Sequence, residues 1–236
     1  MGTREGDNRK QEFLDTALDL FYEEGYENTT INDIIDKVGL SKGAFYHYFN
    51  SKEEVLETIA RQYVEKKLNI VEKVVKEENL NALEKLNKII ADMLDFKLQY
   101  SEIRWKIFKI ITRNNNIKLE NEILDNFLEL AQPLYEKLMK QGVSEGVFNI
   151  NYPEEAAELY VHLTKIFKKM TSGVVANFNC NLDDMEALKK KIKEPENIKA
   201  LKRKYAFYQD TLERIFGTGR GYVKLVDSFL EELKQI

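Results

Sequence analysis

Hydrophobic residues recur at helical spacing along most of this chain. Ile31, Ile34, Ile35 and Val38 fall at positions i, i+3, i+4 and i+7, which is the pattern of one helical face. An earlier apolar stripe covers about residues 9–24, and no strand-like alternation persists in the sequence. Only three prolines and eleven glycines interrupt the chain, and this scarcity favours long helices. The pattern therefore predicts an all-α protein.

Capping residues mark the ends of a short helix between residues 30 and 39. Thr30 precedes the apolar stripe and Asp33 follows three residues later, so the two are close to a capping box. Gly39 comes directly after the last apolar position, where a left-handed residue commonly ends a helix. Ser41 is a good N-cap for a second short helix. Two short helices joined by a tight turn with glycine are typical of a helix-turn-helix.

The second short helix has two different faces. Phe45 can pack inward and Phe49 closes the element. The other face carries polar, basic and aromatic residues, namely Lys42, Gly43, Tyr46 and His47. Such a helix keeps one face available to enter a groove.

The rest of the chain is predicted to form longer helices. They lie at about 52–76, 81–98, 102–112, 117–141, 153–177, 195–217 and 222–235. Three helices the size of those before residue 51 bury too little to be stable alone. We therefore expect the helix that starts near Ser51 to supply the rest of their core.

From about residue 9 to residue 56 the chain resembles the TetR family of bacterial transcriptional repressors. The resemblance is carried by G-Y at 25–26, T-T-I-x-D-I-I at 29–35, V-G-L-S-K-G at 38–43 and F-Y-x-Y-F-x-S-K at 45–52. It implies an N-terminal three-helix DNA-binding domain with a helix-turn-helix, at 1–52. It also implies a larger C-terminal helical domain for ligand binding and dimerisation, at 53–236.

The resemblance further implies which residues contact operator DNA. Thr30 would bind a phosphate from the start of the first short helix, Tyr48 would reach another, and Lys52 would clamp a third. These roles agree with general chemistry, because lysine and hydroxyl groups position proteins on the DNA backbone.

In the recognition helix the resemblance assigns the remaining contacts. Ser41, Lys42 and Gly43 would open the helix with backbone N–H groups directed at the DNA. Tyr46 would contact the backbone or base edges, and His47 occupies the variable base-reading position.

The resemblance implies that the C-terminal body forms a homodimer and binds a small-molecule effector. Dimerisation is expected through helices within 153–177 and 196–216. Aromatic content suggests an apolar or amphipathic effector. The candidate contacts are Phe96, Tyr100, Arg104, Trp105, Phe108, Phe127, His162 and Phe167. A ligand that favours a different arrangement of the two recognition helices would release the DNA, with the 52–76 helix as the lever.

The net charge of the chain does not indicate a nucleic-acid partner. The chain has 36 Lys+Arg and 40 Asp+Glu, for a net charge of −4. Residues 1–52 hold six cations and ten anions, which is again a net charge of −4. Tight non-specific DNA binding is therefore not expected. The alternative is an all-helical protein-interaction module whose helix-turn-helix is silent.

No sequence feature supports an enzyme. The glycine-rich segment at 217–221 follows a helix rather than a strand and lacks the Walker lysine and hydroxyl, so it fails as a phosphate loop. Two histidines and one cysteine offer no catalytic triad, metal site or cofactor site. No signal-peptide pattern opens the chain, no run of about 18 apolar residues exists and there is a single cysteine, so we expect a cytoplasmic protein without a membrane span.

Overall fold

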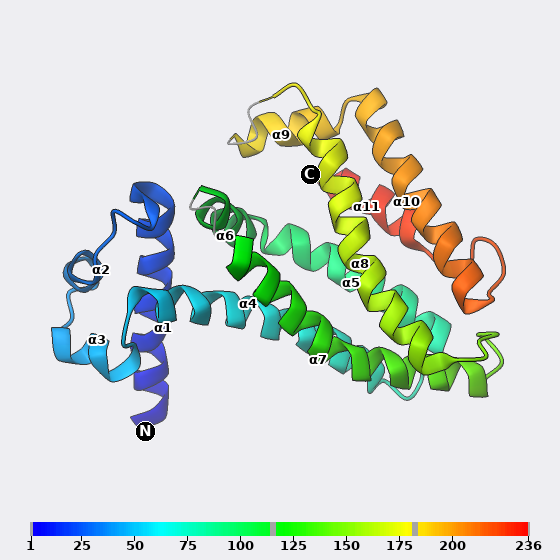
Figure 1. The fold of residues 1–236 in the computed structure, drawn as a ribbon, viewed down its shortest axis with the longest axis horizontal. Helices are drawn as coiled ribbons and strands as arrows, with labels where there is room; N and C mark the ends of the chain where they lie inside the picture. The colour runs from blue at the N-terminus through cyan, green and yellow to red at the C-terminus, as the bar shows by residue number, and fades with distance from the viewer. Residues whose placement is uncertain (1, 114–116, 181–183, 236) are drawn as a thin grey trace. The chain divides into compact units, whose positions relative to one another are not determined.

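The computed structural model describes residues 2–113, 117–180 and 184–235, and every regular element within them is a helix (Figure 1). This confirms the all-α prediction. The elements are α1 (Gly2–Leu20), the π-helical turn η1 (Phe21–Gly25), α2 (Ile31–Val38), α3 (Lys42–Tyr48), α4 (Lys52–Val75), α5 (Ala82–Gln99), α6 (Ser101–Arg113), α7 (Ile117–Ser144), α8 (Pro153–Ala176), α9 (Met185–Ile192), α10 (Pro195–Phe216) and α11 (Leu225–Gln235). None of the helices in these ranges is long and apolar enough to cross a membrane.

The chain packs into two compact units. The first contains the residues up to Lys66 together with Tyr100–Asn126, and the second contains Lys67–Gln99 with Phe127–Ile236. The first unit therefore includes more of the chain than the domain predicted at 1–52. The reason is that the first turns of α4 and most of α6 pack against the N-terminal helices.

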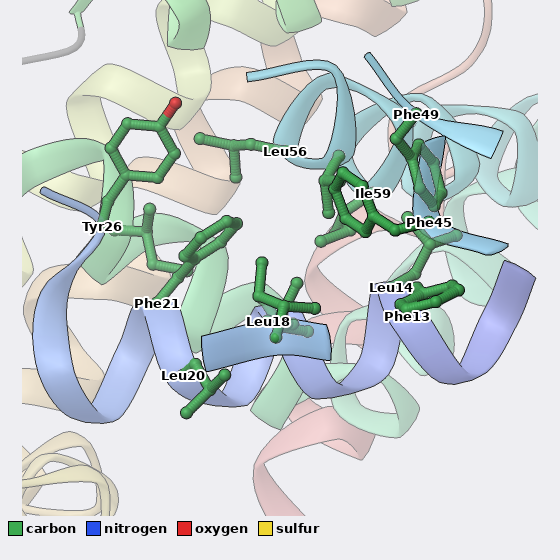
Figure 2. Close-up of a cluster of buried hydrophobic side chains, with 14 of the residues drawn as sticks. Phe13, Leu14, Leu18, Leu20, Phe21, Tyr26, Phe45, Phe49, Leu56 and Ile59 are labelled. Carbon is green, nitrogen blue, oxygen red and sulfur yellow. The ribbon is translucent and has the colours of Figure 1, made fainter. Parts of the chain in front are cut away.

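Aromatic rings make up much of the first unit's core (Figure 2). Phe13 of α1 meets the edge of Phe45 of α3, with ring centroids 5.4 Å apart, and Phe49 lies 5.7 Å from Phe45. All three side chains are buried. Pairs of this geometry stabilise more than their buried area alone, so they fix α3 against α1.

Two other helices complete this core. Val55, Leu56 and Ile59 of α4 are buried in it, which confirms that the helix after Ser51 supplies core residues. Ile107 and Ile110 of α6 are also buried in the same cluster. The short helices carry only a few apolar residues, so their stability depends on segments distant in sequence.

The second unit is a helical bundle in which α8 and α10 lie side by side (Figure 1). Phe167 of α8 stacks on Tyr208 of α10, with ring centroids 4.3 Å apart and planes at 7°. Tyr205 of α10 stacks on Phe229 of α11 at 4.0 Å. These contacts join α8, α10 and α11 through aromatic rings.

The glycine-rich segment at 217–221 is a helix stop that folds around a carboxylate of its own chain. Gly217 ends α10 with a positive φ of 60°, and a Cβ there would meet Asn149 O at 2.6 Å, so only glycine fits. The buried Glu213 accepts hydrogen bonds from the backbone N–H groups of Gly221 at 2.8 Å and Val223 at 3.2 Å. Those N–H groups serve the fold rather than a phosphate.

Candidate nucleic-acid interface

A reciprocal capping box fixes the start of α2. Thr30 Oγ1 accepts the Asp33 N–H at 3.2 Å, and the Thr30 N–H donates to Asp33 Oδ2 at 2.8 Å. The Thr30 hydroxyl also donates to Asp33 Oδ2 at 2.7 Å. The predicted cap is confirmed. In this state the hydroxyl hydrogen that would serve a phosphate is directed at Asp33, and the phosphate contact of Thr30 stays a prediction.

The capping box makes stability at acid pH depend on Asp33. Hydrogen bonds from the Thr30 hydroxyl and then the Thr30 N–H lower the pKa of Asp33. A lowered folded-state pKa stabilises the fold above the ordinary aspartate pKa of about 3.9, and this contribution is lost as the pH falls through the lowered value. We expect Asp33→Ala to destabilise the protein at pH 7 and to flatten the loss of stability below about pH 4. Urea unfolding at several pH values measures this, with Asp36→Ala on the same helix as the control.

A glycine and a serine separate α2 from α3. Gly39 adopts φ 75° and its N–H bonds to Ile35 O, ending α2. Ser41 Oγ accepts the Ala44 N–H at 3.2 Å and begins α3. Both predicted caps are confirmed. Together they give a tight turn that joins α2 to α3, with Ile34, Ile35 and Phe45 buried in one core.

The two faces predicted for α3 are confirmed. Phe45 and Phe49 are buried, whereas Lys42 and His47 are exposed and Tyr46 retains 45% exposure. The Tyr46 ring packs against the edge of Phe45 at 5.5 Å, and Lys42 Nζ lies 6.0 Å from the Tyr46 ring centroid. The outer face of α3 thus presents a cation, a phenol and an imidazole on a helix held by buried aromatic rings.

The start of α3 is open to close approach. Gly43 is exposed, and a Cβ added there would meet no atom of the protein nearer than Ser41 Oγ at 3.9 Å. The interior of the protein therefore does not require glycine at this position. A glycine facing outward allows a partner to approach the backbone closely.

Tyr48 and Lys52, the other two predicted phosphate ligands, are partly engaged within the first unit. The half-buried Tyr48 ring lies 4.8 Å from His47 and 6.4 Å from Phe13. Lys52 Nζ donates to the carbonyl oxygens of Tyr26 at 2.8 Å, Thr29 at 3.3 Å and Glu27 at 3.4 Å. Sequence reasoning gave no signal for these lysine contacts, because they join residues more than 20 positions apart.

The predicted effector contacts fall in both units. Tyr100, Arg104 and Trp105 belong to the first unit, where Arg104 is exposed. The other described candidates belong to the second unit, where His162 is exposed and the rest are buried: Phe96, Phe127, His162 and Phe167. The side chain of Phe108 lies outside the described residues. Effector binding by these residues stays a prediction.

Within the described ranges, no group of three or more His, Cys, Asp or Glu side chains is arranged to hold a metal ion. Two of the three lysines of α9 take part in local ion pairs. Lys189 pairs with Glu186 at 2.8 Å and Lys191 with Glu194 at 2.9 Å. The outer face of α3 gathers a cation, a phenol and an imidazole on a helix whose buried face fixes its orientation.

Known proteins resemble the chain in this region and beyond it. The family model for bacterial regulatory proteins of the tetR family matches residues 13–59. The HTH-type transcriptional regulator YfiR of Bacillus subtilis (strain 168) is 24% identical over 72% of this chain and 80% of its own length. The HTH-type transcriptional repressor KstR2 of Rhodococcus jostii (strain RHA1) is 28% identical over 63% of this chain and 72% of its own.

Solved structures share the fold. SmeT, the repressor of the Stenotrophomonas maltophilia multidrug efflux pump SmeDEF, superposes with a TM-score of 0.57 at 20% identity, covering 90% of this chain and 92% of SmeT. SmeT has also been solved in complex with triclosan. The matched region of the family model contains α2, α3 and the start of α4, which carry the face described above.

Proposed function

We propose that this chain, which belongs to the TetR family of bacterial regulatory proteins, is a dimeric repressor that binds a palindromic operator and is released by a small molecule. One observation carries the DNA-binding part. The outer face of α3 exposes Lys42, Tyr46 and His47, while Phe45 and Phe49 fix the same helix in the core. A rigid helix with an outward polar face is what major-groove reading requires.

Specific contacts, rather than overall charge, would supply the affinity. Residues 1–52 carry a net charge of −4, so attraction to arbitrary DNA is weak. The imidazole of His47 and the phenol of Tyr46 can form hydrogen bonds with base edges or phosphates, and Lys42 can pair with a phosphate. We therefore expect a large ratio between operator and scrambled-DNA affinity.

The test is selection of bound sequences from a random duplex pool, followed by anisotropy titration at two salt concentrations. Enrichment of an inverted repeat supports the proposal. The DNA-binding role is refuted if the selection enriches no sequence, and if duplexes recovered from it bind no more tightly than random ones. The alternative, an all-helical protein-interaction module with a silent helix-turn-helix, would then take its place. The net negative charge of residues 1–52 favours this alternative.

Tyr46→Ala is expected to weaken operator binding by about tenfold to a hundredfold, because a base-edge or backbone contact would be lost. Stability should change little, since the phenol is 45% exposed. Tyr152→Ala removes an exposed tyrosine of the second unit and is the matched control. Equal affinities of wild type and Tyr46→Ala would remove Tyr46 from the interface.

Dimerisation is proposed through α8 and α10. These neighbouring helices expose large apolar side chains, namely Leu159 and Ile166 on α8 and Phe207 on α10. Neighbouring positions on the same helices are buried within the unit, for example Phe167 and Tyr208. A helix with apolar residues on two sides needs a second partner, and a second copy with two-fold symmetry matches a palindromic operator.

The proposed effector is an apolar or amphipathic small molecule bound in the second unit. The buried aromatic side chains there supply stacking surfaces, and Tyr208 Oη has no hydrogen-bond partner among the described residues. Triclosan, bound by SmeT, is a useful first compound in a screen. A true effector raises the melting temperature because it binds the folded protein. It also lowers operator affinity, and operator DNA lowers effector affinity by the same factor.

A further inference from the structure

The ammonium group of Lys52 is surrounded by protein carbonyl groups. Its three nearest acceptors are Tyr26 O at 2.8 Å, Thr29 O at 3.3 Å and Glu27 O at 3.4 Å. The same Nζ lies 4.4 Å from the centroid of the Tyr26 ring. An ammonium has three N–H donors and no acceptor. A DNA phosphate could bind it only by replacing at least one of these contacts.

Glu53, the next residue of α4, acts on the hydroxyl end of the same tyrosine, Tyr26. Burial first, and then hydrogen bonding to the Glu53 carboxylate and its negative charge, raise the pKa of the Tyr26 hydroxyl. Tyr26 is buried and its ring packs on Phe21 at 4.9 Å. Lys52 in the first turn of α4 therefore contacts Tyr26 at its backbone carbonyl and its ring face, and Glu53 acts on its hydroxyl. We call Lys52, Glu53 and Tyr26 the α4 clasp.

The clasp lies directly before the DNA-facing elements. Thr29 is buried and bonds to Gly25 O through both its N–H at 3.1 Å and its hydroxyl at 2.9 Å. Thr30, the next residue, is the N-cap of α2. The carbonyl groups that Lys52 binds thus belong to the segment that sets where α2 begins relative to α4.

We infer that Lys52 is a positioning residue, which fixes the segment 26–29 and α2 against the start of α4 instead of giving its charge to a DNA phosphate. This inference rests on the proposed function for its effect on DNA, but the positioning itself exists in the free protein. It also assigns Glu53, an acidic residue, a supporting role in DNA binding.

Glu53→Gln distinguishes positioning by the clasp from a purely electrostatic effect, because the two predict opposite changes in operator affinity. Removing a negative charge from a DNA-binding unit should strengthen binding if only electrostatics matter. If the clasp positions α2, the same change weakens operator binding, by about threefold to tenfold for one charged hydrogen bond. Glu57→Gln makes the same charge change one turn later on α4 and is the control.

Lys52→Met gives the second test through salt dependence. Loss of a phosphate ligand reduces the slope of log affinity against log salt by about 1. Loss of a positioning contact weakens binding, by about tenfold, with the slope unchanged. Lys52→Arg can reach the same carbonyl groups and is expected to restore part of the affinity. A slope reduced by about 1 in Lys52→Met, with stronger binding in Glu53→Gln, would overturn the inference.

Hydrogen exchange of the free protein makes the test independent of any DNA. We expect Lys52→Met and Glu53→Gln to speed amide exchange at residues 29–35 about tenfold, with no change in the second unit. Unchanged exchange in both variants would overturn the inference even if the operator is known. Faster exchange in the variants, together with no DNA binding by the wild-type protein, would instead uphold the clasp and refute the proposed function.

Discussion

Replacing Phe45 by alanine is expected to lower the free energy of unfolding of the first unit by about 3–5 kcal/mol. The side chain is fully buried and contacts the rings of Phe13 at 5.4 Å and Phe49 at 5.7 Å. Its removal leaves a cavity at the point where α1 and α3 meet. Because domains are stable by only about 5–15 kcal/mol, the first unit would lose a large part of its stability, and operator binding would weaken wherever the unfolded population becomes significant.

Urea unfolding monitored by circular dichroism measures this effect, and Tyr46→Ala is its neighbour and control. Tyr46 lies one residue away on the exposed face of the same short helix. The two variants should therefore fail for different reasons, Phe45→Ala through stability and Tyr46→Ala through affinity. A loss below about 1 kcal/mol for Phe45→Ala would mean that α3 does not depend on this aromatic core.

Local chemistry explains why much of the helix-turn-helix could be predicted. The ends of α2 and α3 depend on Thr30, Asp33, Gly39 and Ser41, whose side chains or φ angles act within four residues. Such caps are visible in sequence. The separation of Phe45 from Tyr46 also follows from helical periodicity, since it concerns one face of one helix.

Non-local contacts explain what could not be predicted. Ile107 and Ile110 enter the core of the first unit from α6, and no local pattern pairs them with residues some 50 or more positions earlier. Lys52 looks like a surface lysine next to a DNA motif, but its acceptors are carbonyl groups of residues 26–29. The beginning of α1 at Gly2 was also missed, because its first residues are polar and carry no apolar stripe.

Helix periodicity also left the two sides of α8 unresolved. Leu159, Ile166 and Phe167 belong to one run of apolar positions, but Phe167 is buried within the unit and the other two are exposed. A sequence pattern identifies apolar faces without saying which chain covers them. The fold of the second unit separates the face already covered from the one proposed for a second copy.

That separation leads to a large expected effect at Phe207. Phe207→Ala is expected to raise the dimer dissociation constant by about a thousandfold. The side chain is 60% exposed in the single chain, so its truncation costs the folded monomer little. In a two-fold interface each substitution occurs twice, and a central aromatic contact contributes about 2 kcal/mol or more per copy, which together give about three factors of ten.

Sedimentation equilibrium over a range of protein concentrations measures the dissociation constant, and Leu130→Ala is the matched control. Leu130 is 57% exposed and belongs to α7, so it is a comparable apolar side chain that is not part of α8 or α10. Dissociation of Phe207→Ala should weaken binding to a full palindrome far more than to a half-site, since only the palindrome uses both recognition helices. An undiminished dimer in Phe207→Ala, or a dimer lost in Leu130→Ala, would place the interface on another face.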